Sequence, residues 1–154
     1  MLFRSAPAEP VVLLAQNEVG LTNLQFLSSE GFKTSDPSDP FVTLDTLCAR
    51  AEGLMLLSGG TRGPLFQMPA EGQKDEATRW LARMQEAFGD RLVVELHRHG
   101  LAVEKAVEPG VLGLASQFGL PLVATNECFF PKPEMYEAHD ALVCIAQGRT
   151  MAEK

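Results

Sequence analysis

The stretch RLVVELHRHG, residues 91–100, decides the fold class of this chain. Its first part, 91–97, is a short apolar run rich in Leu and Val, which is typical of a buried strand. Three more runs have the same character: VVLLA at 11–15, GLMLL at 53–57 and PLVAT at 121–125. Short strands that are apolar on both faces indicate a parallel sheet covered by helices.

Helical patterns separate these four runs. Apolar residues recur at helical spacing in 20–27, 75–88 and 103–118, and a last helix is expected within 133–147. Thr43 is a predicted N-cap for a further short helix. The alternation of strands and helices predicts an α/β fold with parallel strands and covering helices. Four strands are too few to close a barrel, so either the sheet is open or the chain is part of something longer.

The composition is that of one globular domain, with 154 residues of which 45% are hydrophobic and 21% charged. The net charge of −7 argues against a direct grip on a nucleic-acid backbone, which needs clustered Lys and Arg. Cys48, Cys128 and Cys144 are far apart, which favours reduced thiols over a disulfide framework. The start, MLFRSAPAEP, has no apolar signal region, and no run reaches the roughly 18 apolar residues of a membrane span. We therefore expect a cytoplasmic protein that makes no membrane contact.

Polar residues follow each predicted strand. Asn17 and Glu18 follow the first, 58–60 the second, 97–100 the third and 126–130 the fourth. If every strand points the same way, these four clusters meet at one edge of the sheet.

The third strand supplies the best candidates for chemistry. Glu95 and His97 share one side of it because side chains alternate along a strand. A Glu inside an apolar strand is costly unless it is paired or bound to a cation. Together with His99 and Glu127, these residues would supply oxygen and nitrogen ligands for a divalent metal.

Structural roles for the same residues stay open. Glu95 can instead pair with Arg98 or Arg91. His97 fits a surface or capped histidine more readily than a metal ligand.

Three further features have plain structural interpretations. We expect His139, in the last predicted helix, to make a structural hydrogen bond. We expect Cys128 to be a packed thiol rather than a nucleophile, because no base stands at a fixed spacing from it. The glycine-rich stretch SGGTRG at 58–63 is typical of a tight connection and only weakly indicates a phosphate cradle.

Five stretches carry a resemblance to a known family. They are VVLLAQNEVGLTNLQFLSS at 11–29, GLMLLSGGTRGPL at 53–65, RLVVELHRHG at 91–100, LPLVATNECFF at 120–130 and YEAHDALVCIAQGR at 136–149. In this order and spacing they resemble the N-terminal polymerase-and-histidinol-phosphatase (PHP) domain of bacterial replicative DNA polymerase III alpha subunits.

The resemblance implies a fold and a context. The fold is a distorted seven-stranded (β/α)7 barrel with metal ligands at the carboxyl ends of its strands. Residues 11–154 then form an incomplete PHP domain, because the family's first strand with its His-x-His pair has no equivalent here, and residues 1–10 stay unmatched. No palm, fingers or thumb follows, so we expect a fragment of a Mg-dependent DNA-directed DNA polymerase, a nucleotidyltransferase.

The family's ligand positions are only partly kept. His99 matches the family's His after the Glu-containing strand, whereas Pro10 stands where many metal-binding members have His. After VAT, members with an intact site have Asn-Asp-x-His, and this chain has Asn126, Glu127, Cys128 and Phe129. A phenylalanine cannot bind a metal, and losing a nitrogen ligand weakens a site that its ligand count defines. The resemblance leaves His99 and Glu127 as vestigial metal ligands for a residual Zn, Mn or Mg ion, with no catalytic residue and no other cofactor.

Three functions follow as hypotheses. The first is a non-catalytic scaffold within the polymerase, whose partners are the remainder of the alpha subunit, the proofreading exonuclease and other replisome subunits, with DNA reached only through the parent enzyme. The second is a free-standing metal-dependent phosphoesterase or 3′–5′ exonuclease that uses Glu95, His99 and Glu127. The third is an independent interaction module. Unpaired apolar strand edges also predict that the isolated chain associates.

Overall fold

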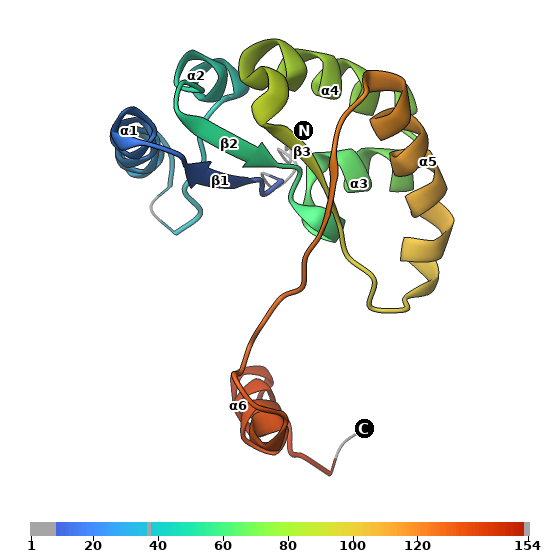
Figure 1. Ribbon diagram of the computed structural model, residues 1–154. Helices are drawn as coiled ribbons and strands as arrows, with labels where there is room; N and C mark the ends of the chain where they lie inside the picture. The colour runs from blue at the N-terminus through green and yellow to red at the C-terminus, as the bar shows by residue number, and fades with distance from the viewer. Residues whose placement is uncertain (1–8, 37, 153–154) are drawn as a thin grey trace, which may run out of the picture.

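A computed structural model describes residues 9–36 and 38–152 of the chain. Residues 1–8, which make up most of the unmatched segment 1–10 and of the start MLFRSAPAEP, lie outside the described residues. The four predicted strands are confirmed to within one residue at each end, and helices lie where the periodicity places them (Figure 1). In chain order the elements are β1 (Val12–Ala15), α1 (Glu18–Thr34), α2 (Leu44–Ala49), β2 (Leu54–Leu57), the 3-10 helix η1 (Gly60–Arg62), α3 (Pro64–Ala70), α4 (Lys74–Phe88), the 3-10 helix η2 (Gly89–Arg91), β3 (Leu92–Leu96), α5 (Ala102–Phe118), β4 (Leu122–Ala124), the 3-10 helix η3 (Pro133–Met135) and α6 (Tyr136–Gln147).

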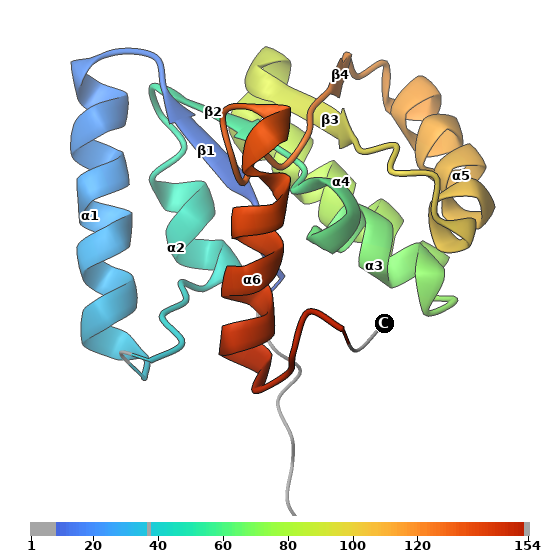
Figure 2. The ribbon, with the colours of Figure 1, turned by 90° about the horizontal axis from the view of Figure 1, so that it is seen from below.

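The strands form one open sheet in the order β1-β2-β3-β4. β2, β3 and β4 are parallel, with Leu56 opposite Leu92 and Glu95 opposite Val123. Figure 2 shows α1 and α2 beside β1 and β2, with α5 beside β3 and β4. This is the predicted α/β class, a mainly parallel sheet with covering helices that is consistent with part of a (β/α) barrel and is not closed.

The first strand runs in the opposite direction to the other three. β1 pairs with β2 in antiparallel fashion, so that Ala15 lies opposite Leu54. Two helices, α1 and α2, connect β1 to β2. The chain leaves β1 and enters β2 at the same end of the sheet, whereas a parallel pair would require the connection to cross to the opposite end. The expectation that Asn17 and Glu18 join the other polar clusters is therefore wrong.

As a result, the residue of β1 that borders the candidate site differs from the one expected. Asn17 caps α1, because its side-chain oxygen accepts a hydrogen bond from the Gly20 N–H at 2.9 Å. Pro10, just before β1, lies at the edge where β2 ends: a Cβ added to Gly59 would come within 2.0 Å of the Pro10 carbonyl oxygen. The start of β1, rather than its end, therefore borders the candidate site.

One face of the central strands forms the core. Leu54 and Leu56 of β2 and Leu92 and Val94 of β3 are fully buried, each with 0% exposure. They pack in one cluster with side chains of α4 and α5, namely Trp80, Leu81, Met84, Phe88, Val107, Val111 and Ala115. This cluster fixes the two strands whose ends carry the candidate site.

The outer strands differ from the predicted double coverage. Leu14 of β1 is 47% exposed and Leu122 of β4 is 50% exposed, because each strand stands at an edge of the sheet. Among the described residues no helix is both long and apolar enough to cross a membrane.

Candidate metal site at the strand ends

The loop after β2 lies directly against β3. Gly60 has a φ of 55°, and a Cβ added to it would come within 2.2 Å of the His97 ring. A side chain at this position would need both an unfavourable left-handed backbone and space that the histidine fills. The glycines of the SGGTRG stretch thus serve a tight connection, as the sequence indicates.

Glu95 is buried at the end of β3, with 8% exposure. One carboxylate oxygen accepts a hydrogen bond from the Gly59 N–H at 3.1 Å, and the other accepts one from the Thr125 hydroxyl. The Glu95 N–H donates to the Ser58 hydroxyl oxygen at 2.9 Å. Glu95 therefore connects the loop after β2 with the end of β4.

Neither arginine proposed as a partner of Glu95 contacts it. Arg98 forms a two-pronged pair with Glu108, at 3.0 and 2.7 Å. Arg91 donates to the backbone carbonyls of Ala51 and Leu54. The arginine-pairing interpretation is wrong because both guanidinium groups have other acceptors.

The His97 side chain is only 7% exposed, so of the two structural alternatives the surface histidine is wrong, whereas a histidine capped by hydrogen bonds fits. The Thr61 N–H donates to Nδ1 at 3.4 Å, and Nε2 lies 3.6 Å from a Glu95 carboxylate oxygen. Since Nδ1 accepts, the ring proton sits on Nε2 and faces Glu95. Both ring nitrogens thus face protein groups.

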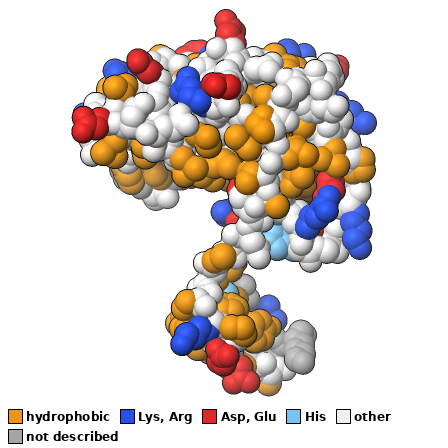
Figure 3. All heavy atoms as spheres, in the orientation of Figure 1, with side chains coloured by type: hydrophobic (Ala, Val, Ile, Leu, Met, Phe, Trp, Pro, Cys, Tyr) orange, Lys and Arg blue, Asp and Glu red, His pale blue; other side chains and the backbone are white. Residues whose placement is uncertain are grey.

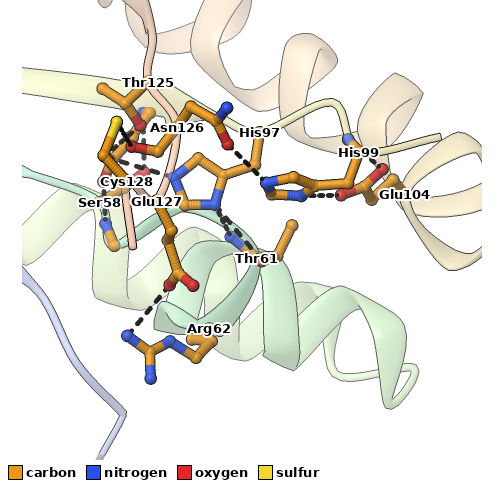
Figure 4. Close-up of polar contacts among 12 residues, drawn as sticks. Ser58, Thr61, Arg62, His97, His99, Glu104, Thr125, Asn126, Glu127 and Cys128 are labelled. Carbon is orange, nitrogen blue, oxygen red and sulfur yellow. Dashed lines mark hydrogen bonds and ion pairs between the residues drawn. The ribbon is translucent and has the colours of Figure 1, made fainter. Parts of the chain in front are cut away.

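His99 lies in the loop after β3 with both ring nitrogens engaged. Nδ1 lies 2.8 Å from a Glu104 carboxylate oxygen, and Nε2 lies 2.9 Å from the Asn126 side-chain oxygen (Figure 4). The hydrogen bond to Glu104, followed by the one to Asn126, raises the pKa of His99 above its ordinary value. Because both partner atoms are oxygens, these contacts stabilise the imidazolium form, in which both nitrogens donate, relative to the neutral ring.

Glu104, near the start of α5, anchors this pair. Its carboxylate accepts from the backbone N–H groups of His99 at 2.9 Å and Leu101 at 3.0 Å. Burial raises the pKa of Glu104, but the hydrogen bonds from His99 and these two N–H groups outweigh it, so the pKa lies below its ordinary value.

The residues after β4 turn in different directions. A Glu127 carboxylate oxygen pairs with the Arg62 guanidinium at 3.1 Å, in an exposed position. The Cys128 side chain is exposed, so the prediction of a packed thiol is wrong. Phe129 is 66% exposed, and its ring lies 5.3 Å from that of His139, centre to centre.

His139 contacts aromatic rings. Its ring also lies 5.3 Å from that of Phe130, and within the described chain no hydrogen bond of its side chain accompanies these contacts. The expectation of a structural hydrogen bond at His139 is therefore wrong, because two aromatic side chains take that place.

The four candidate ligands come from one edge of the sheet, but each is already bonded within the protein. His99 uses both nitrogens, Glu127 pairs with Arg62, and Glu95 accepts hydrogen bonds from two strand ends. Across residues 9–36 and 38–152 no three His, Cys, Asp or Glu side chains are grouped to hold a metal ion. A divalent cation would therefore have to displace these contacts to reach the donors.

Comparison with known proteins places the chain in a family. A family model described as "PHP domain" matches residues 3–99. The chain belongs to the PHP domain family.

The relatives of this chain include polymerase subunits. The chain is 48% identical over 146 residues to the DNA polymerase III subunit alpha of Caulobacter vibrioides, covering 94% of this chain and 13% of that protein. It is 37% identical to the subunit of Rickettsia bellii and 35% identical to that of Treponema pallidum, covering 91% and 93% of this chain and 12% of each relative. These matches confirm the resemblance read from the five stretches, and the chain spans 12–13% of the length of these relatives.

Sequence reasoning missed most partners of the candidate ligands. The polar clusters placed Ser58 and Asn126 at this edge, but not as partners of Glu95 and His99, and Thr61, Arg62 and Thr125 carried no signal of a partner role. Glu104 left a usable signal: it stands three residues after Leu101, just inside the predicted helix, where an acidic side chain reaches back to the backbone at the helix start.

Proposed function

We propose that this chain is a segment of a replicative DNA polymerase III alpha subunit and serves DNA replication as a non-catalytic part of it. The match to named relatives along more than nine tenths of the chain supports this assignment. Its first partner is then the remainder of the alpha subunit, in the cytoplasm, and nucleotide transfer with Mg belongs to that remainder.

The strand-end residues have a structural role in this proposal. Contacts run from the loop after β2 to β3 through Gly59 and Glu95, and from β3 to β4 through Glu95 and Thr125. His99, in the loop after β3, bonds to Glu104 of α5 and to Asn126 after β4, and so adds a second link between these elements. Direct contacts thus hold together the strand ends that a metal ion would join in a ligand-complete member of the family.

The occupation of both His99 nitrogens is the single observation that carries the proposal. A metal needs a nitrogen lone pair, so it would have to displace a proton from a ring whose pKa is raised, and also break the hydrogen bond to Asn126. The Glu127 carboxylate would have to leave Arg62 as well. A hydrolytic metal site also needs an open position for water.

Metal binding and hydrolysis test the non-catalytic role. The purified 154-residue chain is dialysed against Mn²⁺ or Zn²⁺, its bound metal is measured, and it is then incubated with a 3′-labelled oligonucleotide. We expect less than one metal per chain, bound no more tightly than by His99→Ala, and no release of label. Stoichiometric metal together with label release that His99→Ala abolishes would establish the phosphoesterase alternative instead.

A chimera tests the polymerase assignment separately. The matching segment of the Caulobacter vibrioides subunit is replaced by this chain, and the matching Rickettsia bellii segment, from a more distant relative, serves as the control insert. We expect the first chimera to fold and to extend primers at least as well as the control. An inactive chimera beside an active control would contradict the assignment.

We also propose that this segment binds the proofreading exonuclease. The chain carries a net charge of −7, which suits a protein partner better than a direct contact with DNA. Exonuclease retained by the chimera but lost when the segment is deleted supports this role, and equal retention by both speaks against it.

A further inference from the structure

A small cavity lies just inside the strand ends, between β3 and the helices α3 and α5. Its polar wall includes Ser58, Glu95 and His97, and its apolar wall includes Leu65 of α3 and Val111 of α5. The centre of a water molecule has about 10 Å³ of space in this cavity, which is about the room that one water needs. The size of the cavity therefore suits a single small ligand.

The His97 ring brings to this cavity a hydrogen-bond donor without an acceptor at bonding distance. Nδ1 accepts from the Thr61 N–H, so the ring proton is on Nε2 (Figure 4). A Glu95 carboxylate oxygen lies 3.6 Å from Nε2, which is too far for a hydrogen bond. The side chain is only 7% exposed, and on the face drawn in Figure 3 histidine reaches the surface of the body only in a small area. Bulk water therefore gives the Nε2 proton little compensation.

The Ser58 hydroxyl supplies a second donor of this kind. Ser58 is 2% exposed, and its oxygen accepts a hydrogen bond from the Glu95 N–H at 2.9 Å. A hydroxyl also has a proton to donate, and no residue of the described chain accepts it. Buried donors without acceptors are destabilising and rare in folded proteins. Two such donors, one from the loop after β2 and one from the end of β3, line the same cavity.

The same wall offers acceptors to a ligand that has protons of its own. The Glu95 carboxylate accepts hydrogen bonds from the Gly59 N–H and the Thr125 hydroxyl, whereas a carboxylate has about four acceptor positions. A ligand that accepts from two donors and donates to a carboxylate fits this set of groups. A metal ion fits them poorly, because His97 presents a proton to the cavity rather than a lone pair.

We propose that this cavity is a binding site for one structural water molecule, which accepts hydrogen bonds from the Ser58 hydroxyl and the His97 Nε2–H and donates to the Glu95 carboxylate. The water gives both buried donors an acceptor, and it joins the loop after β2 to the two polar side chains at the end of β3. This site rests on the hydrogen-bonding capacity of its wall and does not depend on the polymerase assignment.

A high-resolution crystal structure of the full 154-residue chain tests the site directly. We expect one ordered water at about 2.7–3.2 Å from Ser58 Oγ, His97 Nε2 and a Glu95 carboxylate oxygen. A cavity without electron density would overturn the proposal. Contacts of about 2.0–2.2 Å, which a metal ion makes, would also overturn it.

Magnetic relaxation dispersion of the solvent water counts long-lived internal water molecules in solution, and two matched variants locate this one. Val111→Ile adds a methylene group at the cavity wall, whereas Val107→Ile adds the same group on the same helix at a residue outside the lining. We expect Val111→Ile to lose one long-lived water relative to the wild type and Val107→Ile to lose none. Circular dichroism verifies that each variant is folded.

Ser58→Thr is the second variant that fills the cavity, since it keeps the hydroxyl group and adds a methyl group at the polar wall. We expect it to lose the same water, and it takes the place of Val111→Ile if that variant does not fold. A wild-type chain without a long-lived water, an unchanged count in both filled variants, or an equal loss in Val107→Ile would overturn the proposal.

Discussion

The contact between Gly60 and the His97 ring gives the sharpest test of the site. In Gly60→Ala the new methyl group would come within 2.2 Å of the ring, at a backbone φ of 55°. Holding a non-glycine residue in the left-handed region costs about 1–2 kcal/mol. Overfilling a packed site adds about 1–3 kcal/mol. We therefore expect Gly60→Ala to lower the free energy of unfolding by about 2–5 kcal/mol.

Gly72 provides a matched control for the backbone term. Its φ is 82°, and an added Cβ meets nothing within 4 Å, so Gly72→Ala carries the backbone cost without a clash. Urea unfolding followed by Trp80, the single tryptophan and a buried one, reports both variants at one protein concentration. In a His97→Ala background the excess cost of Gly60→Ala over Gly72→Ala should disappear, because the alanine leaves room for the methyl group.

Two outcomes would refute this reasoning. Equal costs for Gly60→Ala and Gly72→Ala would mean that the histidine ring does not fill the space beside Gly60. An excess cost that persists in the His97→Ala background would mean that another group causes the clash. Either result would show that the His97 ring does not pack against Gly60.

Further predictions concern the same network. The pKa of His99 is raised above 6.5, so its contribution to stability is complete below that pH and is lost as pH rises through the folded-state pKa. The pKa of Glu104 is lowered below 4.5, so its contribution is present above that pH and is lost as pH falls through the folded-state pKa. Unfolding measured against pH should show this pair contributing most between pH 4.5 and 6.5, and NMR titration should show a lower His99 pKa in Glu104→Gln. Glu95→Ala should cost about 1–3 kcal/mol, because it leaves the partly buried Gly59 N–H without its acceptor. Glu127→Ala should cost no more than about 1 kcal/mol in the same assay, because its pair with Arg62 is exposed; a larger loss there than at Glu95 would contradict the burial argument.

The sequence predicted the elements well because their signals are local. Thr43 caps α2 through its hydroxyl oxygen at 3.2 Å from the Thr46 N–H, as its position before the helix indicates. Gly119 and Gly148 end α5 and α6 in the left-handed conformation that glycine favours. Such signals involve residues within one turn of each other, so no knowledge of the tertiary structure is needed to read them.

The direction of β1 was not predicted, because it depends on how a connection packs. Apolar runs mark strands but carry no information on direction, and the segment between 18 and 49 was compatible with either return path. The antiparallel pairing follows only once α1 and α2 are known to lie side by side with β1 and β2. Its effect on the site is large, since Pro10 replaces Asn17 at the edge.

The sequence also did not predict the hydrogen-bond partners of the candidate ligands, for a different reason. Glu95 was expected to choose between a metal and a nearby arginine, yet it bonds to Gly59 and Thr125, which are 36 and 30 residues away along the chain. Hydroxyl and backbone partners of this kind leave no distinctive pattern in a sequence. The chain itself predicted two parts of this geometry. Strand alternation puts Glu95 and His97 on one side, and the residues that follow β2, β3 and β4 meet at one edge of the sheet.

The network also explains how β4 stays attached to the sheet. The strand has three residues, pairs with β3 alone, and has Leu122 half exposed at the outer edge. So short a ladder gives few backbone hydrogen bonds, but the next two residues add the links of Thr125 to Glu95 and of Asn126 to His99. The link of Thr125 to the buried Glu95 is partly shielded from water and so strengthened relative to a surface contact, whereas the link of Asn126 to His99 is exposed. The strand-end residues that the sequence offered as candidate metal ligands thus hold an edge strand in this chain, and this gives the buried carboxylate of Glu95 a structural role.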